Sequence, residues 1–209
     1  GIPNCWPPAD IFSWVIRKVL PALPTRYVMS NPPPISEDNM QVTVGIAEMK
    51  VSKGAEDLII THALGSCLGI TAYDPMTRVG GMLHAMLPQG SLNAEKAVEN
   101  PYMFVDTGLP RLFEACLRAG AAKNRLIITV AGGAAMKSNG GGEDFFQIGK
   151  RNIVMLRNTL WSEGIMLKAS DVGGGAARTL TIEIGTGEVV TRTGTASTVL
   201  LPARNSVAA

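Results

Sequence analysis

Residues 61–84 hold the pattern that decides the fold of this chain, and they read THALGSCLGITAYDPMTRVGGMLH. An apolar, β-branched run leads up to Asp74 and Pro75, and a second apolar run follows Arg78. Aspartate followed by proline is typical of a turn, because proline fixes φ at a value that suits the first central position. The stretch therefore predicts a β-hairpin.

The register of this hairpin determines which side chains meet. If Pro75-Met76 form the loop, Asp74 pairs with Thr77. Seven steps outward, Cys67 then pairs with His84. Directly opposed residues of an antiparallel pair have Cβ atoms about 4.5–5.5 Å apart, so a thiol and an imidazole could touch. Because a slip of one residue would put them on opposite faces, this prediction depends on the loop length.

A cysteine opposed to a histidine is typical of covalent catalysis. A free thiol has a pKa near 8.5, but an adjacent imidazole can take its proton, and the thiolate can then attack a carbonyl. The histidine later protonates the leaving group. We expect Cys67 to be the nucleophile and His84 the base. Gly65 and Ser66 form a candidate oxyanion or substrate loop, because small residues let backbone N–H groups approach a substrate oxygen.

Other residues of the same types are expected to have no catalytic role. Cys116 lies on the apolar stripe of a predicted helix and should be part of the core, and Cys5 is likewise expected to have no catalytic role. His62 directly follows Thr61, so strand alternation should point it away from the face of that threonine. The hydroxyl of Ser66 stands beside an available thiol, so we interpret it as turn chemistry rather than as a second nucleophile.

The global composition narrows the class of protein. The chain has 209 residues and a formal net charge of +2, which suits one domain and gives no basic surface for nucleic acid. Its three cysteines have no paired spacing, which favours a reducing, cytoplasmic location over a disulfide framework. We find no ligand spacing typical of a metal site and no apolar run long enough for membrane insertion. We therefore expect no metal, no cofactor and no nucleic-acid partner.

The chain divides by composition into three parts. Residues 1–41 should form an N-terminal arm with a short amphipathic helix at Asp10–Leu20 and a Pro-rich linker. Residues 42–195 should form the folded domain, and residues 196–209 a flexible C-terminal tail.

Periodicity predicts many strands and few helices within the domain. Strands are expected at Gln41–Val51, Leu58–Thr61, the hairpin, Leu126–Ala131, Ile165–Ala169, Thr179–Ile184 and Glu188–Thr193; helices are expected in the second half of Asn100–Ala119 and at Gly149–Glu163, and a flexible glycine-rich loop at Gly132–Gly142. This order favours an α+β fold in which mixed or antiparallel sheets pack into a β-sandwich-like core with helices on the outside.

Several motifs resemble those of the CheD family of chemoreceptor glutamine deamidases. They are LGSC at 64–67, YDP at 73–75, GGMLHAMLP at 80–88, DTGLP at 106–110, GGAAM at 132–136, IGKRN at 148–152 and DVGG at 171–174. The resemblance extends from near Val44 to near Val190, and the block from Cys67 to His84 is its most specific part.

The resemblance implies a cysteine-hydrolase type deamidase fold and a Cys–His–Thr site. The threonine six positions before the cysteine is Thr61 here, and it would orient the imidazole. The family implies a protein-glutamine glutaminase that acts on the cytoplasmic helices of chemoreceptors and that binds the phosphatase CheC. Two departures concern partner contacts rather than chemistry: residues 175–178 read GAAR where the family has an Asn-Tyr-Gly-Arg-like continuation, and Pro101 replaces a common lysine.

Two other functions fit a cysteine–histidine site of this kind. One is a regulatory module that binds CheC and has little catalytic role. The other is a toxin-like cysteine deamidase that acts on other proteins, similar to cytotoxic necrotizing factors. The spacing of Gly80 to His84 favours the CheD resemblance over the toxin.

Overall fold

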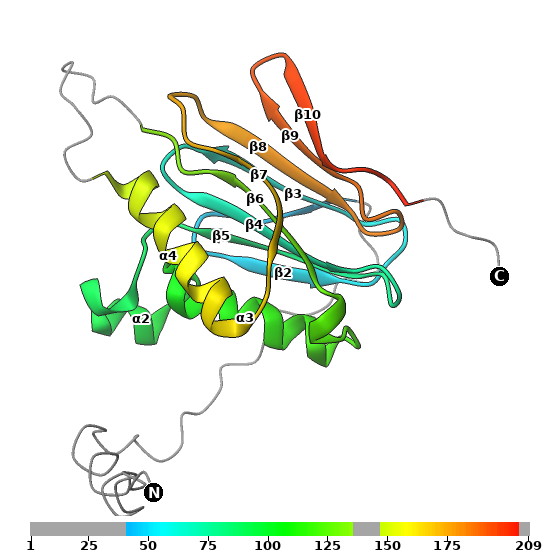
Figure 1. Ribbon diagram of the computed structural model, residues 1–209, viewed down its shortest axis with the longest axis horizontal. Helices are drawn as coiled ribbons and strands as arrows, with labels where there is room; N and C mark the ends of the chain where they lie inside the picture. Colours follow the sequence, from blue (N-terminus) through cyan, green and yellow to red (C-terminus); the bar gives the residue numbers. More distant parts are fainter. Residues whose placement is uncertain (1–40, 136–146, 205–209) are drawn as a thin grey trace, which may run out of the picture. The chain divides into compact units, whose positions relative to one another are not determined.

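The computed structural model of the chain describes residues 41–135 and 147–204, all within the unit Pro33–Ala209 (Figure 1). The strands are β1 (Gln41–Thr43), β2 (Met49–Ser52), β3 (Leu58–Leu64), β4 (Leu68–Asp74), β5 (Val79–Ala85), β6 (Ile127–Gly132), β7 (Leu167–Val172), β8 (Arg178–Glu183), β9 (Val189–Thr193) and β10 (Ala196–Leu201). The helices are α2 (Ala94–Glu99), α3 (Val105–Arg118) and α4 (Ile148–Glu163), with short 3-10 turns at Gly90–Leu92, Pro101–Met103 and Lys123–Arg125. The arm expected at 1–41 lies outside the described residues except for Gln41, as do residues 136–142 of the expected glycine-rich loop.

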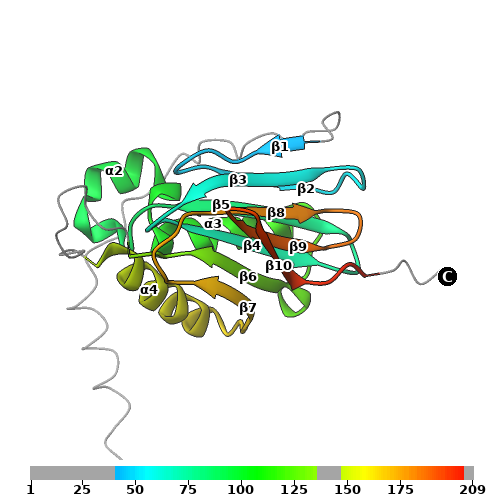
Figure 2. The ribbon, with the colours of Figure 1, turned by 90° about the horizontal axis from the view of Figure 1, so that it is seen from above.

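The strands form two five-stranded sheets that pack face to face. We call the sheet with the order β1-β3-β8-β9-β10 the outer sheet, and the sheet with the order β2-β5-β4-β6-β7 the central sheet. Each is mixed, because β1 runs parallel to β3 and β6 runs parallel to β7 while the other pairs are antiparallel. Figure 2 shows the outer sheet in front of the central one. The predicted α+β fold with packed sheets is confirmed.

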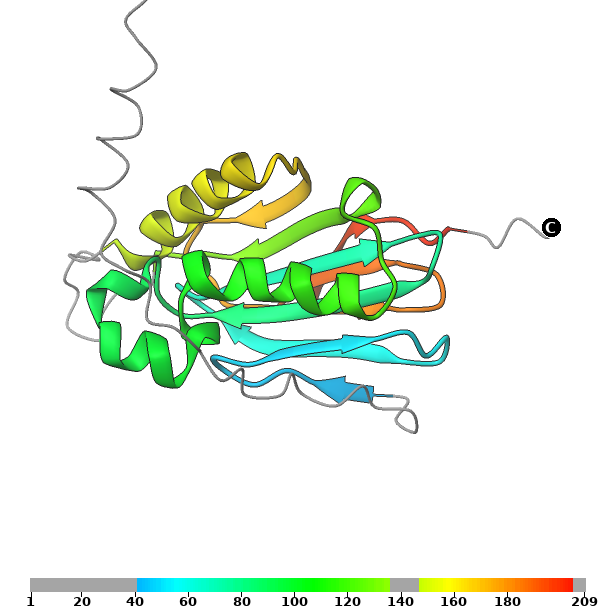
Figure 3. The same ribbon diagram turned by 90° about the horizontal axis from the view of Figure 1, so that it is seen from below.

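The helices cover the face of the central sheet that points away from the outer sheet. Figure 3 shows α3 and α4 lying across that face. One apolar core fills the space between these helices and the central sheet, and it includes Leu68 and Ile70 of β4. A second core lies between the two sheets and includes Leu64 of β3 and Met82 of β5. Strands β4 and β5 are buried along their whole length because both of their faces are covered.

The expected strand Gln41–Val51 is in fact two strands in different sheets. β1 pairs with β3 in the outer sheet, whereas β2 pairs with β5 in the central sheet. The chain crosses between them, and Ala47 adopts a left-handed φ of 56° in the crossing. The apolar pattern continues through the crossing, so periodicity alone predicted one strand.

The tail expected at 196–209 is also corrected by the structure. Ala196–Leu201 forms β10, which pairs antiparallel with β9. The connection is a two-residue hairpin loop that begins at Gly194 with a φ of 57°, a conformation that glycine adopts readily. The predicted helices agree better with the structure. α3 covers the second half of its predicted range but begins earlier, at Val105, and α4 ends at Glu163 with Gly164 as its C-cap at a φ of 66°.

Candidate functional site

The hairpin of β4 and β5 is present, but its predicted register is wrong. Asp74 pairs with Val79 rather than Thr77, so the loop has four residues, 75–78, and Gly69 stands opposite His84. The Asp74 carboxylate accepts the backbone N–H of Met76 and holds the longer loop, which closes with Arg78 at a φ of 54°. The shift is two residues, so the side of the sheet that each side chain faces does not change.

His84 extends from β5 toward the outer sheet and meets Thr61 of β3. The Thr61 Oγ1 atom lies 2.8 Å from His84 Nδ1 and donates its own hydrogen to the backbone oxygen of Val44 at 2.8 Å. A hydroxyl has one hydrogen, so Thr61 accepts from His84, and Nδ1 carries the imidazole hydrogen. The contact joins the two sheets at one point of their shared core.

The tautomer leaves the other ring nitrogen available as a base. His84 is 1% exposed, and its Nε2 atom is buried with no hydrogen-bond partner among residues 41–135 and 147–204. Burial lowers the pKa of His84, because the charged imidazolium loses solvation. The ring is therefore a neutral base whose orientation is fixed at Nδ1 and whose lone pair is free at Nε2.

Cys67 lies in the bend between β3 and β4, directly before β4 begins. It is half-buried and packs against the core between the two sheets, the side toward which His84 also points. Burial raises the pKa of the Cys67 thiol, and its own backbone N–H partly offsets the rise. The thiol is not hydrogen-bonded to Nε2, which has no partner within the part of the chain that the structure describes. Both pKa directions favour a neutral thiol and a neutral imidazole at rest over a preformed ion pair.

One glycine-rich segment, residues 132–134, holds the loop that carries Cys67. Gly133 N–H donates to Cys67 O at 2.8 Å, and Ala134 N–H donates to Gly65 O at 2.8 Å. A Cβ on Gly132 would lie 2.2 Å from Cys67 O, so this position has no room for a side chain. Residues 132–134 of the GGAAM motif thus pack their backbone closely against this loop.

Backbone groups of the candidate oxyanion loop already form hydrogen bonds within the protein. Gly65 N–H donates to Ala63 O at 2.8 Å, and Ala63 has a left-handed φ of 57°. The N–H of Gly65 is therefore already paired. Ser66 O accepts a hydrogen bond of 2.9 Å from the side-chain amide of Asn152, a residue of α4 that the sequence pattern did not single out. Its only sequence signal was its place in the IGKRN motif.

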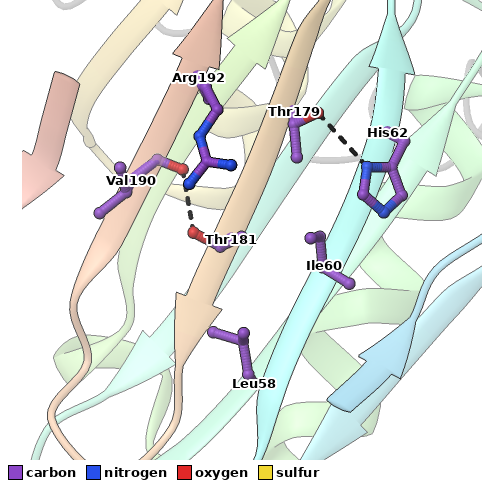
Figure 4. A pocket seen from close by; sticks show the side chains of 7 residues that line it. All are labelled: Leu58, Ile60, His62, Thr179, Thr181, Val190 and Arg192. Atoms are coloured by element: carbon purple, nitrogen blue, oxygen red, sulfur yellow. Dashed lines mark hydrogen bonds between the residues drawn. The ribbon is translucent and has the colours of Figure 1, made fainter. Parts of the chain in front are cut away.

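His62 lies on the opposite face of the outer sheet from Thr61, as predicted. Its Nδ1 atom is 3.4 Å from Thr179 Oγ1, and its side chain is exposed (Figure 4). It lines a cavity of about 240 Å³ together with residues of β3, β8 and β9: Leu58, Ile60, Thr179, Thr181, Val190 and Arg192. This cavity is separate from the core that His84 enters.

The remaining sequence predictions concern the other cysteines, metal binding and membrane insertion. Cys116 is fully buried in the core beneath α3, as predicted, and Cys5 lies outside the described residues. Across residues 41–135 and 147–204 no group of three histidine, cysteine or acidic side chains could hold a metal ion. No helix in the same ranges is long and apolar enough to cross a membrane.

Comparison with known proteins gives consistent matches over most of the chain. Residues 86–193 match the family described as CheD chemotactic sensory transduction. A protein of Syntrophus aciditrophicus named "Probable chemoreceptor glutamine deamidase CheD 1" is 44% identical over 148 residues, which cover 71% of this chain and 91% of that relative. Proteins named "Probable chemoreceptor glutamine deamidase CheD" are 46% identical in Solibacter usitatus and 42% identical in Pyrococcus abyssi, each over 149 residues, 71% of this chain and 86% and 89% of those relatives. Among solved structures, the Bacillus licheniformis hypothetical protein YfiH aligns with 40% of this chain and 26% of its own at a TM-score of 0.29 and 10% identity.

Proposed function

This chain belongs to the CheD family, and on that premise we propose that it is a chemoreceptor glutamine deamidase with a Cys67–His84–Thr61 site. It converts glutamine side chains of the receptor to glutamate and releases ammonia. The family match begins at residue 86, so it does not depend on Cys67, His84 or Thr61. The geometry of those residues therefore adds support that the family-model match over residues 86–193 does not include.

One observation carries the catalytic part of this proposal. The 2.8 Å contact between Thr61 and His84 holds the hydrogen on Nδ1 and leaves Nε2 as a free acceptor. A general base needs that arrangement, in which one ring nitrogen is held by a partner and the other is available. A module that only bound CheC would have no need for it, so the arrangement favours the enzyme over the binding module.

The reaction follows from these groups. His84 Nε2 takes the proton of the Cys67 thiol, and the sulfur attacks the carboxamide carbon of the glutamine. The tetrahedral intermediate collapses, and nitrogen leaves as ammonia with the proton that His84 held. Water then attacks the resulting thioester with Nε2 as base, which yields glutamate and the free thiol. Thr61 keeps the ring in place in every step, and the loop of Gly65 and Ser66 lies beside the reacting carbonyl.

The lowered pKa of His84 is consistent with these reaction steps. Because the pKa of His84 is lowered, the ring is neutral at neutral pH and can accept the thiol proton, and its conjugate acid is a stronger donor to the departing nitrogen than an ordinary imidazolium. The raised pKa of Cys67 means that the proton leaves only as the substrate is attacked. We thus propose that His84 activates the thiol as a general base, rather than that Cys67 is a preformed thiolate.

The substrate and partners come from the family. We propose the cytoplasmic helices of chemoreceptors as the substrate, a CheC-type phosphatase as a partner, and the cytoplasm as the place of action. The names of the relatives support the receptor substrate for those proteins.

The proposal is tested with a purified cytoplasmic receptor fragment. Incubation with the protein should release ammonia and convert specific glutamines to glutamate, read as the amide-to-acid mass shift of tryptic peptides. Cys116→Ser is the matched control, because it changes a fully buried core thiol away from the site. Absence of any conversion with the intact protein, across receptor fragments of the same organism, would contradict the proposal.

A further inference from the structure

Asn152 joins the two segments that carry the proposed nucleophile and base. It lies in the first turns of α4 and is fully buried. Its Nδ2 atom donates to Ser66 O at 2.9 Å and to Met86 O at 2.9 Å. Ser66 directly precedes Cys67, and Met86 is two residues beyond His84, so one side chain holds both segments.

The contact lies where β4 and β5 separate. Their ladder ends at the pair of Leu68 and Ala85. Beyond it, the backbone N–H groups of Met86 and Leu87 donate to Met103 O instead of to the strand partner. The side chain of Asn152 spans the opening at that point and replaces the next rung of the ladder.

The orientation of the amide is fixed by its neighbours. Both contacts are carbonyl oxygens, which only accept, so the NH₂ group must face them and both of its hydrogens are used. The Oδ1 atom then points the other way and is buried, with no hydrogen-bond partner among the described residues. An unpaired buried acceptor is unfavourable, and an apolar side chain of similar shape would avoid it. Asn152 thus combines an oxygen whose burial is energetically unfavourable with two N–H donors that bond the segments carrying Cys67 and His84.

We propose that Asn152 is a positioning residue of the deamidation, which sets the separation between the Cys67 loop and the end of β5 that carries His84. The inference rests on the function proposed above. It adds the residue that determines whether the thiol and Nε2 can meet when substrate is bound. Displacement of a reacting group by about 1 Å can lower a rate on the order of 100-fold, so the loss of this link should be visible in kcat.

The test compares Asn152→Leu with Thr159→Val on the full chain. Thr159 is a buried polar residue seven positions later on the same face of α4, about 10 Å along the helix axis. Steady-state deamidation of the receptor fragment should show kcat lowered at least about tenfold in Asn152→Leu with KM nearly unchanged. Thr159→Val should stay within about twofold, although both substitutions replace a buried polar side chain with an apolar one.

A second measurement separates positioning from general loosening of the fold. The rate of Cys67 alkylation by iodoacetamide, followed on the Cys67 peptide, is compared in His84→Ala, Asn152→Leu and the double variant. If Asn152 acts through the Cys67–His84 geometry, the double variant reacts no more slowly than His84→Ala alone. If Asn152→Leu does not fold, the smaller Asn152→Ser enters the same cycle.

The outcomes distinguish this inference from its premise. An active Cys67→Ala variant would overturn the proposed function itself. An inactive Cys67→Ala together with wild-type kcat in Asn152→Leu would overturn only the positioning role. Independent, additive effects of His84→Ala and Asn152→Leu on alkylation would overturn it as well.

Discussion

Replacement of Thr61 by valine removes one oxygen from the centre of the site and leaves the shape of the side chain unchanged. Two hydrogen bonds of 2.8 Å disappear, one from His84 Nδ1 and one to Val44 O. Because Thr61 is fully buried, no water replaces the hydroxyl, and the free energy of unfolding should fall by about 1–3 kcal/mol. Valine fits the strand, so β3 itself should be retained.

The effect on activity should be larger than this loss of stability suggests. Without its acceptor, the Nδ1 hydrogen no longer fixes the tautomer or the rotation of the ring, so Nε2 is less often the free base. We expect kcat/KM to fall about 10- to 100-fold, less than the 10²–10⁴-fold that the complete loss of a general base typically produces.

The assay is ammonia release from the receptor fragment, with urea unfolding to show that the protein is folded at the assay temperature. Thr61→Ser is the matched control, since it keeps the hydroxyl and should retain most activity. Wild-type kcat/KM in Thr61→Val would refute the role of Thr61, and so would equal losses in the serine and valine variants.

Three further predictions concern the other titratable groups. His84→Ala should lower kcat/KM by about 10²–10⁴-fold, whereas His62→Ala, on the outer face of the outer sheet, should stay within about tenfold; equal losses would mean that the wrong histidine was assigned. Because the pKa of His84 is lowered, its base form persists to lower pH, so the acid limb of the kcat/KM profile should have its midpoint below the ordinary value of 6.5, and a midpoint above 6.5 would contradict this. Burial raises the pKa of the Asp74 carboxyl, but hydrogen bonds from Arg125, Ala122 and Met76 and the charge of Arg125 together lower it to about 2. The stability that this carboxylate contributes is present above pH 3.8, the pKa of the unfolded chain, and is lost as the pH falls toward 2. Urea unfolding as a function of pH should therefore show about 2 kcal/mol of acid destabilisation that is missing in Asp74→Asn.

The hairpin shows which features of the fold the local sequence could predict. The turn at Asp74 and Pro75 was evident, and alternation along the strands gave the correct side of the sheet for His84. The register was wrong because the loop length depends on distant contacts. Asp74 also accepts from the backbone of Ala122 at 2.8 Å and from Arg125 at 2.6 to 3.1 Å, neither of which is visible in the turn sequence.

The site itself was only partly accessible to pattern reasoning. Thr61 came from the family resemblance, since a threonine on a strand is ordinary, and its contact with His84 joins different sheets. Asn152 was missed because its acceptors are 66 and 86 positions away along the chain. Such contacts are set by the packing of α4 onto the central sheet and leave no periodic signal.

The change of sheet between β1 and β2 was missed for a similar reason. Val44 is buried and continues the apolar pattern of its neighbours, yet its N–H donates to Ile60 O of the outer sheet, while the N–H of Ala47 donates to His84 O of the central sheet. The crossing also brings Val44 O to the hydroxyl of Thr61, so the break in the expected strand is part of the site.

In the proposed mechanism, Cys67 forms a covalent bond to the substrate carbonyl. Rapid quenching in acid during turnover of the receptor fragment, followed by mass spectrometry of the protein, tests it directly. We expect an adduct on the Cys67 peptide whose mass is that of the two components less ammonia, and neither adduct nor glutamate formation in Cys67→Ala. Conversion of glutamine to glutamate by Cys67→Ala at the wild-type rate would contradict a role for Cys67 as the nucleophile.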